Sequence, residues 1–103
     1  MKPLRERPPL ESTVEQYLID QVRALGGKTI KLAGAEAGTP DRLVALWDEA
    51  FLIEVKRPGA KLRQLQRARA IEWSEDGISV YYVDSREAVD EILEKRAESA
   101  EER

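Results

Sequence analysis

The chain has 103 residues and a mass of 11.7 kDa, a size that fits one compact domain. It contains 17 basic and 20 acidic residues, a net charge of -3, and its 42% hydrophobic residues exclude intrinsic disorder. The absence of Cys and His excludes disulfides, zinc sites built on thiolates or imidazoles, and a Ser-His-Asp triad. No apolar run approaches the roughly 20 residues that cross a bilayer, and the start has no apolar signal core, so we expect a soluble intracellular protein. Any catalysis must therefore use Asp, Glu, Lys and a hard metal ion.

The charges are unevenly distributed along the chain. Residues 55–71 contain six basic residues and no acidic one, whereas residues 84–103 contain eight acidic and four basic residues. The basic segment has a charge density that suits a phosphate backbone. A solvated helix face would give the same pattern, so both interpretations stay open.

In chain order, the first half predicts one helix and three strands. Residues 1–10 are rich in Pro and predict a flexible N-terminal arm, and residues 11–25 have apolar residues at helical spacing before a Gly-Gly stop. Residues 28–32 alternate as a short strand, and residues 33–39 predict a loop. Residues 41–47 and 50–56 predict the two strands of a β-hairpin that turns around Asp48-Glu49.

The second half predicts a helix, a strand and a last helix. Residues 62–73 have a helix-forming composition, and residues 78–83 form a nearly continuous apolar run, typical of a central strand buried on both faces. Asp84 or Ser85 is expected to cap the last helix, and a charged C-terminal tail, residues 97–103, is expected to fray. The order α-β-β-β-α-β-α predicts an α/β fold with a mixed sheet flanked by helices.

The predicted hairpin brings together residues that can carry chemistry. Glu54 and Lys56 are two residues apart on one strand, so their side chains share a face, while the apolar residues that alternate with them face the core. If the hairpin turns at Asp48-Glu49, Asp41 lies opposite Lys56. If it turns one residue earlier, Asp41 lies opposite Glu54. Both registers gather the three side chains on one face of the hairpin. A register shifted by one residue would instead place Asp41 on the apolar face, where an unpaired carboxylate is very unfavourable.

The paired carboxylates of Asp41 and Glu54 need a counter-charge. Two carboxylates about 4 Å apart repel each other by roughly 4 kcal/mol at an effective dielectric constant of 20. A divalent cation supplies the charge, and ligation by carboxylates, a backbone carbonyl and waters suits Mg²⁺ or Mn²⁺. Lys56 on the same face can orient water or stabilise charge on phosphorus oxygens. The alternative is an ordinary cross-strand ion pair on a solvated face of the sheet.

These motifs resemble the VRR-Nuc family of the PD-(D/E)XK nuclease superfamily, whose fold is restriction-endonuclease-like. The resemblance covers most of residues 12–90, within a predicted nuclease domain of residues 11–96. The residues that carry it are Gly38-Thr39-Pro40-Asp41-Arg42-Leu43-Val44, Phe51-Leu52-Ile53-Glu54-Val55-Lys56, Pro58-Gly59-Ala60-Lys61-Leu62 and Gln66.

The resemblance implies a role for each residue of the site. Asp41 and Glu54 would bind Mg²⁺ or Mn²⁺, with the backbone carbonyl of Val55 as a further ligand. Lys56 would be the catalytic lysine. The family pattern also implies that Gln66 lies near the phosphate and that Glu15 completes the acidic cluster. The residues that we predict to contact DNA are Arg42, Arg57, Lys61, Arg63 and Arg67.

Several of these residues have a competing structural explanation. Ser12-Thr13-Val14-Glu15 matches a capping box, in which Glu15 would serve the helix start and not a metal. Gln64 is an alternative to Gln66, and either can be an ordinary exposed helix residue. Four aromatic residues either stack on bases or belong to the core: Trp47, Trp73, Tyr81 and Tyr82.

The sequence therefore predicts a metal-dependent DNA endonuclease. The standalone relatives that it resembles, in bacteriophages and bacteria, imply a preference for branched DNA such as four-way (Holliday) junctions, a homodimer, and action in the cytoplasm of a bacterial host cell. The alternative is a catalytically inactive nucleic-acid-binding or assembly protein that keeps the nuclease fold.

Overall fold

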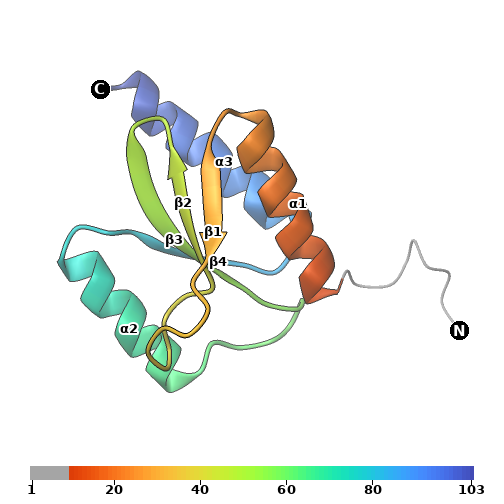
Figure 1. Ribbon diagram of the computed structural model, residues 1–103, viewed down its shortest axis with the longest axis vertical. Helices are drawn as coiled ribbons and strands as arrows, with labels where there is room; N and C mark the ends of the chain where they lie inside the picture. Colours follow the sequence, from red (N-terminus) through yellow and green to blue (C-terminus); the bar gives the residue numbers. More distant parts are fainter. Residues whose placement is uncertain (1–9) are drawn as a thin grey trace, which may run out of the picture.

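A computed structural model describes residues 10–103, so the predicted N-terminal arm lies, apart from Leu10, outside the described residues. Its elements follow the predicted order (Figure 1). They are α1 (Glu11–Ala24), β1 (Lys28–Lys31), β2 (Arg42–Leu46), β3 (Glu49–Val55), α2 (Gln64–Glu75), β4 (Val80–Val83) and α3 (Arg86–Glu101). No helix within residues 10–103 has the length and apolar content to cross a membrane.

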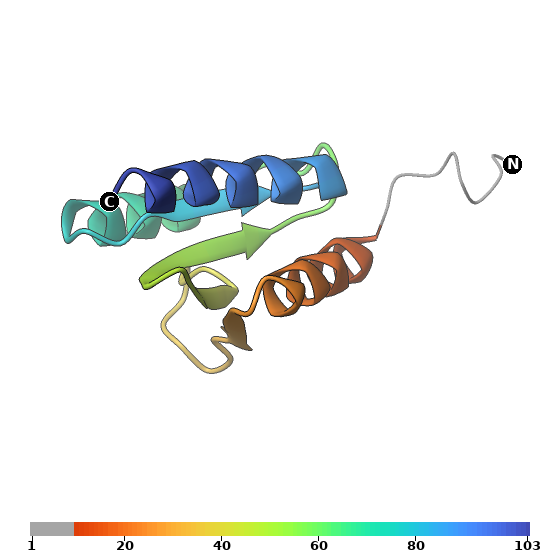
Figure 2. The same ribbon diagram turned by 90° about the horizontal axis from the view of Figure 1, so that it is seen from above.

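The four strands form one mixed sheet in the order β1-β2-β3-β4. The first three strands are antiparallel neighbours, and β4 pairs with β3 in parallel. A parallel pair cannot be joined by a tight turn, and α2 makes the crossover between β3 and β4. Figure 1 shows α2 on the opposite side of the sheet from α1, and Figure 2 shows α3 running along β4. The predicted mixed sheet with flanking helices is confirmed.

The main core lies between one face of the sheet and helices α1 and α3. In α1 the residues Val14, Leu18 and Val22 are spaced four apart and are fully buried. They meet the side chains of Phe51, Ile53 and Val55 on β3, together with Val44, Leu46, Val83, Val89 and Leu93. The predicted core face of the hairpin is therefore confirmed. Each such side chain contributes roughly 1.5–3 kcal/mol when it is fully buried.

The strand β4 is an edge strand, and the prediction that residues 78–83 form the central strand is wrong. Helices α2 and α3 cover its two faces, which explains its apolar composition. Its outer backbone edge has no strand beside it among residues 10–103. An apolar sequence predicts that both faces of a strand are covered, but it does not predict whether the strand has a neighbour on one edge or on both. Tyr81 packs edge-on against Phe51 and so belongs with the core, whereas Trp73 on α2 is 42% exposed.

The hairpin turns one residue earlier than Asp48-Glu49. Leu46 pairs with Glu49, so Trp47 and Asp48 form a two-residue loop. Their φ angles of 53° and 62° are both positive, as a type I′ turn requires. This turn matches the twist of the strands, although neither residue is a glycine. It selects the second of the two predicted registers, the one that places Asp41 opposite Glu54.

Helix α3 begins as predicted and ends later than predicted. The Ser85 side chain accepts a hydrogen bond from the Ala88 backbone at 3.0 Å, which confirms Ser85 as the N-cap. The helix continues to Glu101, so the expected fraying from residue 97 is wrong. Arg96 and Arg103 both pair with Glu49 beside the hairpin turn, and these ion pairs hold the last turns of α3 against the sheet.

Candidate active site

Asp41 and Glu54 lie next to each other where β2 begins and β3 ends. The β2–β3 register runs to Arg42 opposite Ile53, and one further step places Asp41 opposite Glu54. The Asp41 Oδ2 accepts a hydrogen bond from the Val55 backbone N–H at 2.9 Å. In a strand the N–H and C=O of one residue point to the same side, so the Val55 carbonyl also points toward the Asp41 side.

The loop before Asp41 packs closely on α2. Gly38 has a φ of 84°, and a Cβ at this position would lie 2.7 Å from the Leu65 Cγ. Only glycine fits both this backbone and this space. Pro40 is buried beside it. The contact between this loop and α2 therefore holds Asp41 at the end of the sheet, close to the first turns of α2.

Glu54 is a buried carboxylate with one oxygen free. Its residue is 5% exposed, its Oε1 accepts a hydrogen bond from Gln66 Nε2 at 2.7 Å, and the Lys56 Nζ lies 3.7 Å from the same oxygen. Its Oε2 is buried without a hydrogen-bond partner among the described residues. Burial, and secondarily the charge of Asp41, raises the pKa of Glu54 to about 7, while Lys56 acts in the opposite direction.

Gln66, and not Gln64, is the glutamine of the site. It is the third residue of α2, where its Oε1 accepts a hydrogen bond from the Arg63 backbone at 2.9 Å. This bond fixes the side chain so that its Nε2 points at Glu54. Gln64 is exposed. The choice between the two glutamines is thus made by the start of α2 at residue 64, two residues later than predicted.

The oxygens of this site suit a hard divalent cation. The unpartnered Oε2 of Glu54 is a buried acceptor that a cation would satisfy. Asp41 lies opposite Glu54 across the hairpin, and the Val55 carbonyl points toward the Asp41 side of β3. Among residues 10–103 no three carboxylates lie close enough together to form a metal site alone. A cation here would therefore be held by two carboxylates, one carbonyl and waters, a set typical of Mg²⁺.

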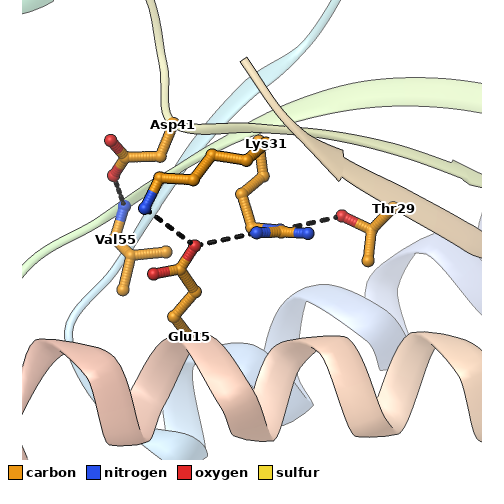
Figure 3. Close-up of polar contacts among 6 residues, drawn as sticks. Glu15, Thr29, Lys31, Asp41 and Val55 are labelled. Carbon is orange, nitrogen blue, oxygen red and sulfur yellow. Dashed lines mark hydrogen bonds and ion pairs between the residues drawn. The ribbon is translucent and has the colours of Figure 1, made fainter. Parts of the chain in front are cut away.

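Glu15 is held by two cations and not by the helix start (Figure 3). Its Oε2 lies 2.8 Å from Arg42 Nη1 and 3.6 Å from Lys31 Nζ. The capping-box interpretation is wrong, because α1 begins at Glu11 with Leu10 as its N-cap and no side chain caps it. The predicted place of Glu15 in an acidic cluster stays a prediction.

Arg42 is a correction to the predicted DNA contacts. It is 7% exposed, and its guanidinium donates to Glu15 and to the Thr29 Oγ1 at 3.1 Å. It shares a strand face with the core residues Val44 and Leu46, a parity that the sequence already contained. The other predicted contacts are exposed: Arg57, Lys61, Arg63 and Arg67.

Comparison with known proteins assigns the family. No family model matches the chain. A solved structure described as "VRR_NUC domain" superimposes with a TM-score of 0.75 and 31% identity, over 82% of this chain and 94% of that chain. The chain belongs to the VRR-Nuc family. Its fold is therefore that of the PD-(D/E)XK nucleases, as the sequence motifs predicted.

The chain is also similar to a curated protein from a bacteriophage. This relative is described as "Putative nuclease p44" of Acyrthosiphon pisum secondary endosymbiont phage 1. The two are 40% identical over 53 residues, which is 50% of this chain and 57% of the relative. The alignment thus spans little more than half of that protein.

The buried charge of Glu54 predicts that Glu54→Gln stabilises the metal-free protein. The pKa of Glu54 is raised from an ordinary value of 4.5 to about 7, so folding binds a proton between these pH values. The ionised form therefore destabilises the fold most above pH 7, and this cost disappears as the pH falls toward 4.5. One pKa unit corresponds to about 1.4 kcal/mol, so we expect a gain on the order of 2–3 kcal/mol at pH 8.

Urea denaturation in EDTA at pH 8 and pH 5 measures this gain. It should shrink toward zero at pH 5, where Glu54 is protonated in the wild type. Glu75→Gln, an exposed substitution at the end of α2, is the control and should change stability little at both pH values. A gain for Glu54→Gln that is the same at both pH values would contradict the assignment of a raised pKa.

The buried pairing of Arg42 predicts that Glu15→Gln destabilises the protein. The substitution leaves the guanidinium of Arg42 buried without a carboxylate, which costs about 1–3 kcal/mol. The midpoint of urea unfolding measures the loss. Glu11→Gln, an exposed change one turn earlier on α1, is the matched control. Equal midpoints for the two variants would show that the Arg42 pair contributes nothing to folding.

Proposed function

We propose that this VRR-Nuc protein is a metal-dependent DNA endonuclease that hydrolyses phosphodiester bonds. The observation that carries the proposal is the buried Oε2 of Glu54, unpartnered among residues 10–103, beside Asp41 and with Lys56 within 3.7 Å of the same carboxylate. A structural ion pair on a solvated face would leave no buried oxygen without a partner. Membership of a nuclease family supports hydrolysis as the reaction.

Each residue of the site has a proposed role in the reaction. Asp41, Glu54 and the Val55 carbonyl would hold Mg²⁺ or Mn²⁺, which when bound polarises the phosphate and lowers the pKa of a water molecule. Lys56, whose side chain is 15% exposed, stabilises the negative charge that develops on the phosphorus oxygens. Gln66 holds Glu54 in position through its 2.7 Å hydrogen bond. Water is added across the P–O bond, which leaves one phosphate end and one hydroxyl end.

DNA is the proposed substrate because exposed basic residues flank the site. Arg57 and Lys61 lie in the loop after β3, and Arg63 and Arg67 lie at the start of α2, on the side where Gln66 meets Glu54. These cations match the phosphate backbone and carry no base-specific information. We therefore propose a substrate defined by backbone shape, with branched DNA such as four-way junctions preferred. We also propose that the protein acts in the cytoplasm of a bacterial host.

One assay tests the proposed activity. Purified protein is incubated with labelled linear, flap and four-way DNA, with Mg²⁺, with Mn²⁺ and with EDTA. We expect cleavage only with a divalent cation and most of it on the four-way substrate. Metal-dependent binding without cleavage of any substrate would instead favour an inactive nucleic-acid-binding protein with the nuclease fold.

We further propose a homodimer that presents two sites to one branched substrate. One 103-residue domain has little surface left to sense DNA geometry, whereas two sites at a fixed separation can match diverging strands. Exposed apolar side chains on β1 and α2 support an additional protein contact, namely Ile30, Leu65, Ile71 and Trp73.

The dimer predicts a mass in solution of twice the 11.7 kDa of one chain. Light scattering at micromolar protein concentration measures it. The dimer also predicts faster cleavage of four-way DNA than of linear DNA. A monomeric mass together with equal rates on the two substrates would remove the dimer and leave the nuclease proposal standing.

A further inference from the structure

Lys31 presents an exposed positive charge beside the candidate site. Its side chain is 61% exposed, and its Nζ lies 3.6 Å from Glu15 Oε2. The same oxygen accepts a 2.8 Å hydrogen bond from Arg42, whose guanidinium is buried. The single negative charge of Glu15 is thus already balanced by Arg42. The cluster of Glu15, Arg42 and Lys31 carries a net positive charge, and the accessible part of that charge is the Lys31 ammonium.

The backbone fixes Lys31 next to Asp41. Lys31 pairs with Arg42 in the β1–β2 register, and the Leu32 N–H donates to the Asp41 carbonyl at 2.8 Å. The end of β1 is therefore tied to the residue that begins the acidic site. In the view of Figure 3 the Lys31 side chain extends from β1 past Asp41 toward Glu15. The position of this lysine is set by strand pairing and not by a mobile loop.

The charge of Lys31 contributes little to the stability of the fold. An exposed ion pair contributes about 0–1 kcal/mol, and Glu15 keeps its stronger partner if Lys31 is removed. Lys56 is different, because it is mostly buried and faces Glu54. The exposed cations predicted from the sequence lie after β3 and on α2, whereas Lys31 lies on β1, which flanks β2 on the side away from β3. A strand crossing the site would thus meet positive charge from both sides.

We propose that Lys31 binds a DNA backbone phosphate adjacent to the one at Asp41 and Glu54. The proposal rests on the proposed function, since it names a further DNA contact of the same site. A compact ammonium on a flexible stem suits a single phosphate oxygen, and such a contact fixes the position of the strand without reading its sequence.

The test compares Lys31→Gln with Lys28→Gln by fluorescence anisotropy of a labelled four-way DNA in EDTA at several salt concentrations. Lys28 is an exposed lysine at the other end of the same strand, opposite Ala45, so it lies three residues farther along the sheet from Asp41. We expect Lys31→Gln to weaken binding about fivefold at low salt and to reduce the slope of log K against log salt by about 1. Lys28→Gln should weaken binding less than about twofold.

A structural role would move the melting temperature, so both variants are also melted. Unchanged melting with the larger binding loss supports the proposal. Equal binding by the two variants, a loss at Lys31 that follows destabilisation, or a wild type that binds no DNA overturns it. Cleavage with Mg²⁺ is measured separately. Weaker binding by Lys31→Gln, with a wild type that never cleaves, would retain the phosphate contact and reject the nuclease.

Discussion

Asp41→Asn and Glu54→Gln should each abolish DNA cleavage while the protein stays folded. Each substitution removes one carboxylate from a cross-strand pair, and the loss of one charged ligand weakens Mg²⁺ binding at a site where no third carboxylate among residues 10–103 completes a metal-binding group. Each new amide keeps the shape and most hydrogen bonds of the carboxylate that it replaces. The Val55 N–H can still donate to an amide oxygen at position 41, so the end of the hairpin should not unravel.

The measurement is cleavage of four-way DNA with Mg²⁺, with far-ultraviolet circular dichroism to check folding. Asp48→Asn is the matched control, because it makes the same chemical change at a turn residue of the same hairpin, where Asn accepts a positive φ. The control should cleave at the wild-type rate. Wild-type rates in either site variant would remove Asp41 or Glu54 from the catalytic site and favour a cross-strand ion pair.

The site could be predicted because strand parity is strict. Glu54 and Lys56 share a face whatever the register. Asp41 joins them on that face only in a register that places it opposite Glu54 or Lys56, and not in one that places it opposite Val55. The partner of Asp41 depended on a shift of one residue in the position of the turn, which the sequence left open. Trp47 and Asp48 at positive φ settle it, and no rule of turn composition favours Trp at such a position.

Other features depended on contacts between distant segments. Arg42 was predicted to touch DNA because it is basic and adjacent to Asp41, but its parity places it on the core face, where Glu15 of α1 neutralises it. Lys31 was not predicted at all, because nothing within its own strand marks it. Its position beside Asp41 follows from the pairing of β1 with β2, and its contact with Glu15 follows from the packing of α1 against the sheet.

The end of α3 shows the same limit of local reasoning. The sequence after residue 96 has the charge and composition of a frayed tail, yet the helix continues because Glu49, at the hairpin turn, attracts Arg96 and Arg103. The helix start was predictable, since Ser85 acts on a backbone N–H three residues away. Local signals thus located the start of α3 and the faces of the hairpin strands, whereas long-range ion pairs decided the end of α3 and the burial of Arg42.

Lys56→Ala should lower the rate of cleavage about a hundredfold or more and change metal affinity little. The ammonium sits beside Glu54 and acts on charge that exists only in the transition state, so its loss falls on the turnover rate and not on binding. Lys56→Arg should not restore the rate, because a planar guanidinium cannot occupy the position of a compact ammonium. Lys61→Ala, an exposed change in the following loop, should lower the rate far less.

The design must separate the loss of a catalytic group from the protonation of a ligand. Lys56 lowers the pKa of Glu54, so Lys56→Ala raises that pKa further and keeps more of the carboxyl protonated near neutral pH. Single-turnover rates are therefore measured from about pH 7 to about pH 9.5 at saturating Mg²⁺, a range that spans the ionisation of Glu54, with metal affinity determined by calorimetry at each pH. A deficit that persists at the highest pH, with metal binding intact, identifies Lys56 as catalytic. If the variant regains the wild-type rate once Glu54 is ionised, Lys56 serves only to keep the metal ligand charged.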